Sequence, residues 1–252
     1  NWLFIYGYVD GVPEGAMGAS LATSIARWSA AAMMLSYVWF MRAGDQFAIR
    51  EPAPGGWRAW SHQRRLGYAT GVSLGVESTA FTAMQQFAGW LGAVPLAAFT
   101  ATFYLLVVSF MVAIGFGGAT AVRVGIARGR GDSLDMALAG WTGLGLTLFF
   151  TAVLGFLMVG FDTEIIAVFT NDANVAAIAI PAVFWVAVAL MSDGGQAVIA
   201  NALRGRQDVW MACYIQTFVF FGIMVPLSWF LMFPMGQGVA GAFQGVWIAT
   251  MV

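Results

Sequence analysis

A stretch of 28 mostly apolar residues, from Ala176 to Leu203, carries one charged side chain, Asp193. As an α-helix with a rise of about 1.5 Å per residue, it is long enough to cross a hydrocarbon core about 30 Å thick. A carboxylate at the centre of a membrane helix costs about 2.5 to 3.5 kcal/mol, so it usually faces a bundle interior and serves ions, protons or substrate. The sequence therefore predicts a membrane-spanning helix with a functional acid near its middle.

The composition of the whole chain is that of an integral membrane protein. Hydrophobic residues make up 60% of it and charged residues only 9%, against about one quarter charged residues in a soluble domain. We expect an all-α polytopic transmembrane bundle of six complete spans and two partial ones, at 1–6 and from 238 onward. The six complete spans are the apolar segments long enough to cross as helices, at 14–41, 66–91, 94–121, 136–160, 176–203 and 209–235.

The basic residues predict an orientation. All eleven are arginines, and every one except Arg27 lies in alternate connections between the expected spans. By the positive-inside rule, these connections, at 42–65, 122–135 and 204–208, are expected to face the cytoplasm.

The chain is expected to hold parts of two lobes. The connection 42–65 is rich in arginine, proline and glycine, and separates the end of a first lobe, 1–41, from a second lobe, 66–252, whose last helix is truncated. The chain starts at Asn1 without a methionine and ends within an apolar run, so we expect it to be a piece of a longer protein.

Two acids lie inside the expected spans, Glu77 and Asp193. Glu77 is 12 residues from Arg65, and Asp193 is 11 residues from Arg204, which places both about 16 to 18 Å from the cytoplasmic boundary. Two carboxylates at one depth on different helices predict a cation or proton site. The alternative is that each carboxylate only hydrogen-bonds a neighbouring helix.

Two neutral residues are candidates to support this acid pair. Gln196 lies one turn from Asp193, and Ser73 lies one turn from Glu77, so each could supply a neutral oxygen. The alternative for both is a hydrogen bond that holds two helices together.

Enzymatic chemistry has little support in the sequence. The only histidine, His62, lies in the 42–65 connection, and the only cysteine, Cys213, lies in an apolar span. The glycine-rich run Arg128–Asp132 has neither the Walker A nor the dinucleotide-binding spacing. We expect no enzyme, no cofactor, no nucleic-acid partner and no metal other than Na⁺ as a coupling ion, with H⁺ as its alternative.

Five runs of the sequence carry a family resemblance: GVSLGVESTAF, which contains Glu77, LGAVPLAA, AVRVGIARGRGD, MSDGGQAVIANALRGRQD, which contains Asp193, and GVAGAFQGVWIAT. Together they resemble the second half of bacterial multidrug and toxic compound extrusion (MATE) transporters of the NorM-like branch. The resemblance covers nearly the whole chain. Three positions depart from the family pattern: Ala69 replaces a frequent proline, and Phe99 and Tyr104 replace commonly polar residues.

The resemblance implies a monomeric transporter of twelve helices in two six-helix lobes, embedded in the lipid bilayer of a bacterial inner membrane. It would export small cationic or amphipathic drugs in exchange for sodium ions or protons. This chain would supply the end of the fifth helix to the start of the twelfth, and Glu77 and Asp193 match the acidic cation-site positions. A lipid-linked saccharide flippase of the same superfamily and an intramembrane enzyme are the alternatives.

Overall fold

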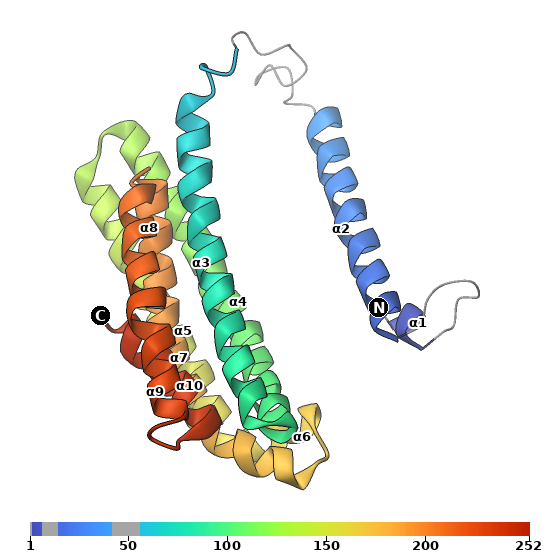
Figure 1. Cartoon of the computed structure of the whole chain (residues 1–252). Helices are drawn as coiled ribbons and strands as arrows, with labels where there is room; N and C mark the ends of the chain where they lie inside the picture. Colours follow the sequence, from blue (N-terminus) through green and yellow to red (C-terminus); the bar gives the residue numbers. More distant parts are fainter. Residues whose placement is uncertain (1, 7–14, 42–55) are drawn as a thin grey trace. The chain divides into compact units, whose positions relative to one another are not determined.

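A computed structural model describes residues 2–6, 15–41 and 56–252, which belong to two compact units, Asn1–Ala59 and Trp60–Val252 (Figure 1). The first unit holds α1 (Trp2–Ile5) and α2 (Gly15–Phe40), which pack on each other. The second unit is a bundle of helices. These are α3 (Ser61–Leu91), α4 (Ala93–Arg130), α5 (Ser133–Gly160), α6 (Asp162–Phe169), α7 (Ala173–Gly205), α8 (Val209–Thr217), a π-helical segment η2 (Phe218–Met224), α9 (Val225–Met232) and α10 (Gly238–Thr250).

The all-α prediction is confirmed, since the described ranges contain helices and no strand. Four helical runs in these ranges are long and apolar enough to cross a membrane, namely α4, α5, α7 and the continuous run from α8 to α9. The other two expected complete spans, α2 and α3, are 26 and 31 residues long, which is sufficient in length. They are less apolar than the four, and α3 in particular carries glutamines and Glu77 in its central and last turns.

Two predicted connections are shorter than expected. α3 begins at Ser61, so the last residues of the predicted 42–65 connection are helical, and α4 continues through its arginines to Arg130. Arginine, glutamine and alanine are good helix formers, so a helix that leaves the apolar zone can continue through them. The connection at 204–208 matches its prediction closely, while residues 42–55 lie outside the described residues. The short helix α6 was not predicted.

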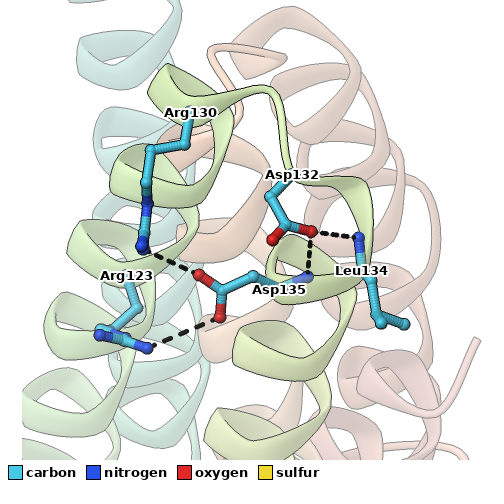
Figure 2. Close-up of polar contacts among 5 residues, drawn as sticks. All are labelled: Arg123, Arg130, Asp132, Leu134 and Asp135. Carbon is cyan, nitrogen blue, oxygen red and sulfur yellow. Dashed lines mark hydrogen bonds and ion pairs between the residues drawn. The ribbon is translucent and has the colours of Figure 1, made fainter.

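The turn between α4 and α5 is fixed by local chemistry. Gly131 ends α4 in the left-handed region at φ 73°, which glycine adopts without strain. The next residue, Asp132, accepts hydrogen bonds from the backbone N–H groups of Leu134 at 3.0 Å and Asp135 at 2.9 Å, and so caps α5 (Figure 2).

Asp135 ties the first turn of α5 back to α4. Its carboxylate lies 2.9 Å from a guanidinium nitrogen of Arg130 and 3.6 Å from one of Arg123 (Figure 2). Two of the arginines that predicted the orientation therefore also hold the α4–α5 turn in shape.

α7 is the central helix of the second unit, and it packs against α4, α5, α6, α8 and α10. Small residues let these helices approach closely. A Cβ atom at Gly194 would lie 3.3 Å from Ala113 of α4 and 3.3 Å from Thr151 of α5. At the far end of α7, a Cβ atom at Gly205 would meet the backbone of Ala121.

Aromatic rings join α4 to α10 in the core. Phe99 is fully buried, and its ring stacks on Phe103 at 5.8 Å and on Phe243 at 5.4 Å between centroids. A polar side chain at position 99 would interrupt this apolar contact, so the departure from the family pattern at Phe99 is a packing feature here.

The arginine-bearing ends of the second unit's helices lie together. Arg128 of α4 and Arg206 after α7 line one pocket, and the start of α3 packs on the start of α8 through Ala69 and Val209. Figure 1 shows these ends at the upper side of the bundle. This grouping agrees with arginine-rich turns that share one side of the membrane.

We predict that this end faces the cytoplasm. In a Cys213→Ala background, a Ser61→Cys side chain at the start of α3 should react with a membrane-impermeant maleimide in inside-out vesicles and stay unlabelled in intact cells. The Cys213→Ala protein without the new cysteine is the control. Labelling of intact cells from outside would contradict the orientation.

We also predict that the stability of the bundle depends on the close approach of α4 and α7 at Gly205. Gly205→Ala should lower the free energy of unfolding by about 1 to 3 kcal/mol, because the new methyl group meets backbone atoms that cannot rotate away. Gly129→Ala is the matched control, since a Cβ atom there meets nothing within 4 Å, and its effect should be neutral or stabilising by up to about 1 kcal/mol. Thermal unfolding in detergent measures both, and equal melting temperatures for the two variants would refute the packing argument.

Candidate functional site

A cavity of about 390 Å³ lies between α3, α4 and α7. Both acids predicted from the sequence line it, Glu77 from α3 and Asp193 from α7. The structure therefore brings together two residues that lie 116 positions apart in the sequence. The sequence analysis predicted a shared site for these two acids because they lie at a common depth in the membrane.

Asp193 is the more buried of the two acids, with only 5% of its surface exposed. It is followed by Gly194 and Gly195, which are buried too. Because these two glycines have no side chains, α4 and α5 can close around α7 at this level, and they hold the carboxylate away from lipid.

Glu77 is partly exposed on the cavity side of α3. It lies close enough to Asp193 for the two carboxylates to repel each other, and close enough to Arg204 to be attracted by its guanidinium. The carboxylates therefore form one electrostatic unit.

Among residues 2–6, 15–41 and 56–252, neither carboxylate forms a hydrogen bond or a salt bridge. The alternative that each acid only hydrogen-bonds a neighbouring helix thus finds no support in this part of the chain. Two acids without protein donors, one of them almost fully buried, are suited to bind a cation or a proton.

The rest of the cavity wall is mostly apolar and aromatic. Phe81 comes from α3, and Phe103, Phe110 and Met111 come from α4. Gln85 of α3 adds an amide on the same wall. Apolar walls with a few polar groups are typical of sites for small organic molecules, and methionine and aromatic side chains adapt to ligands of different shapes.

The two predicted supporting residues do not line this cavity. Gln196 lines a second cavity, of about 480 Å³, together with Ser192 and Thr250, whose hydroxyl oxygens lie 2.6 Å apart. Ser192 and Gln196 are four residues apart and so share a face of α7. Ser73 is buried in α3, with 1% of its surface exposed.

The sequence analysis did not single out the buried glutamine Gln216. Gln216 of α8 is 6% exposed, and its Oε1 has no hydrogen-bond partner among the described residues. Its signal was present, because it is a polar side chain inside the apolar segment 209–235. No group of three or more histidine, cysteine, aspartate or glutamate residues that could hold a metal ion occurs in the described part of the chain.

The architecture is that of a known class of membrane transporter. A crystal structure of a MATE protein in the bent conformation superposes with a TM-score of 0.79 at 17% sequence identity, over 99% of this chain and 54% of that one. The protein is therefore a multi-pass membrane protein with a MATE-type helical fold.

Sequence comparison identifies the family. The MatE family model matches residues 69–230, and the chain belongs to this family. It is 30% identical over 252 residues to the "Probable multidrug resistance protein NorM" of Caulobacter vibrioides, and 32% identical over 254 residues to the protein of that name from Xanthomonas campestris pv. campestris. Both alignments cover 100% of this chain and 54% of the relative, so the chain spans about half the length of these relatives. Their names are those of resistance proteins, in agreement with the expectation that the chain is not an enzyme.

Neutralising the unpaired Asp193 and neutralising the ion-paired Asp135 should have opposite effects on the stability of the protein. Asp193→Asn should leave the melting temperature unchanged or raise it, because an amide is less costly to bury than a carboxylate without a partner. Asp135→Asn is the contrasting variant, and it should reduce stability by up to about 1 kcal/mol because it weakens two partly exposed ion pairs. Thermal unfolding in detergent at neutral pH tests both. A clear loss of stability in Asp193→Asn would assign that carboxylate to packing.

Proposed function

We propose that this chain forms part of a cation-coupled exporter of small cationic or amphipathic compounds. The observation that carries the proposal is the cavity in which Glu77 and Asp193, from two different helices, face apolar and aromatic walls. The names of the relatives, which are multidrug resistance proteins, support the same substrate class.

The acids account for exchange between an ion and a substrate. Two carboxylates close together in a water-poor cavity are stabilised by a proton, a sodium ion or the positive charge of a drug. Because all of these neutralise the same negative charge, binding of one weakens the binding of another. Inward movement of the ion down its gradient can thereby drive outward release of the substrate.

The aromatic walls account for broad substrate selection. Flat apolar drugs gain contact area against Phe81, Phe103 and Phe110, while the acid pair favours positive charge over negative charge. Only the acids need a defined geometry. The apolar walls can take substrates of several shapes.

We propose a bacterial inner-membrane location with the arginine-rich turns in the cytoplasm, and action as a monomer. The lipid bilayer and the small-molecule substrates are the expected partners. Alternating access in transporters built from two repeats needs both of them, so the functional unit would be the full-length protein, with a length similar to that of the relatives.

The cavity favours this proposal over a lipid-linked saccharide flippase. A flippase that holds an anionic diphosphate needs cationic side chains where the substrate sits. Among the described residues that line the cavity there are two acids and no arginine. A cationic or neutral substrate fits that charge.

We predict that Glu77 and Asp193 act as one coupling unit. In the full-length transporter, Glu77→Gln or Asp193→Asn should remove gradient-driven dye efflux, because neither amide can exchange a proton or balance a cation. The double variant should be scarcely worse than either single variant, since groups that share one ligand are not additive.

Dye efflux at matched protein level, across a range of sodium concentrations and pH, provides the measurement. Asp135→Asn is the control, because it neutralises an acid at the α4–α5 turn outside the acid-lined cavity. Near-normal efflux by both single variants would exclude the pair as the coupling site.

A further inference from the structure

Gln216 Oε1 is a buried acceptor without a hydrogen-bond partner among the described residues. With 6% of the residue exposed and Oε1 unbonded among the described residues, it costs about 1 to 3 kcal/mol relative to a satisfied group. Buried polar groups in membrane helices commonly contact an ion, a water molecule or a substrate. Gln216 Oε1 is therefore a candidate ligand for an ion, a water molecule or a substrate.

The neighbours of Gln216 place it on the face of α8 that meets α3. Three residues earlier, Cys213 packs on Ala69 of α3. Four residues later, Phe220 contacts Phe81 of α3, with 6.2 Å between ring centroids. Cys213 and Gln216 both lie in α8 and are three residues apart, so they share a face of that helix, and Gln216 faces α3 at a level between Ala69 and Phe81. Figure 1 shows α3 and α8 side by side.

That interval of α3 contains Ser73 and Glu77. Ser73 lies on the buried face, with 1% of its surface exposed, and Glu77 follows one turn later. The flanking contacts with Ala69 and Phe81 therefore place Gln216 at about the level of Ser73 and Glu77 along α3. Its helix also meets α7, because Ile215 and Val219 line the second cavity together with Gln196.

The backbone changes form directly after Gln216. The π-helical segment η2 begins at Phe218 and runs to Met224. π-helical turns are rare and occur frequently at functional sites. The π-helical segment is an observation independent of the unbonded Gln216 Oε1, and it follows Gln216 on the same helical run.

We infer that Gln216 Oε1 and Ser73 Oγ form a neutral-oxygen binding station for a sodium ion, on the arginine-rich side of Glu77 and Asp193. The inference rests on the proposed antiport function and specifies its ion. Sodium is a hard cation and binds carboxylate, carbonyl and hydroxyl oxygens. An amide and a hydroxyl cannot store a proton at physiological pH, so these groups add nothing to a proton site.

The station lies on the route between the acid pair and the cytoplasmic end. Ser73 is four residues closer to that end than Glu77, which is about 6 Å along the helix. An ion that leaves the carboxylates would thus find neutral oxygens one turn further on. Neutral ligands hold a cation more weakly than carboxylates, which suits a step on the way to release.

The test compares sodium-driven dye efflux by the full-length transporter in liposomes, for the parent protein, Gln216→Leu, Ser73→Ala and a control. Gln86→Leu is the matched control, since Gln86 is an exposed amide on α3 that does not line the acid cavity. In Gln216→Leu the sodium concentration for half-maximal efflux should rise about tenfold. This is the lower end of the loss in ion affinity that follows when a residue supporting an ion site is removed. Maximal efflux at saturating sodium should be retained. Ser73→Ala should shift in the same direction and Gln86→Leu should not shift.

Thermal unfolding separates this role from packing. Without sodium, Gln216→Leu should be at least as stable as the parent, because it removes a buried acceptor that has no partner among the described residues. Sodium should raise the melting temperature of Gln216→Leu less than that of the parent. Unchanged sodium dependence in Gln216→Leu, or a loss of maximal efflux without a shift in sodium dependence, would overturn the inference. Efflux by the parent driven by protons alone would overturn it and leave the antiport proposal intact. No gradient-driven efflux by the parent would overturn both.

Discussion

The burial of the Asp193 carboxylate within apolar helices is the constraint on which the second unit depends. Keeping this group at 5% exposure requires α7 to be surrounded, and α4, α5 and α10 surround it. In lipid, helices gain little from the hydrophobic effect on association, so close van der Waals contact has to hold them together. The glycines of α7 supply that contact at Gly194, beside the acid, and at Gly205, at the arginine-rich end. The residues that shield the acid are therefore the ones that allow the helices to pack.

The second acid lies in a different mechanical setting. Glu77 is on α3, which packs against α4 and against the run from α8 to α9, whereas α7 lies at the centre of the bundle. A cation shared by Glu77 and Asp193 would connect this outer helix to the central one, and loss of the cation would leave two repelling carboxylates in its place. In the proposed mechanism, the charge state of the cavity thus acts on the position of α3 relative to α7, which line the cavity from two sides. This is the kind of two-state element that coupling between ion and substrate needs.

The sequence predicted the parts of this arrangement that depend on hydrophobicity and depth. Apolar segments predicted the helices, and counting residues from Arg65 and Arg204 predicted that Glu77 and Asp193 share a level. Helix ends were less accurate, because polar helix formers extended α3 and α4 beyond the apolar zone. Depth also does not specify which way a side chain points around the helix. Gln196 has nearly the depth of Asp193 and yet lines another cavity, and the unbonded state of Gln216 follows from packing between helices that no single segment reveals.

Charged and neutral oxygens have separable effects in such a site. Exchange of one monovalent cation for a singly charged drug leaves the net charge of the acid pair and its ligand unchanged, so neither direction of exchange leaves an extra buried charge. The number of carboxylates therefore determines the charge that a ligand must carry. Neutral oxygens such as those of Ser73 and Gln216 change the affinity for an ion without changing that balance. Substitution of an acid should consequently abolish exchange, whereas substitution of a neutral oxygen should move the ion concentration at which exchange occurs, and this difference distinguishes a coupling residue from one that tunes the ion's affinity.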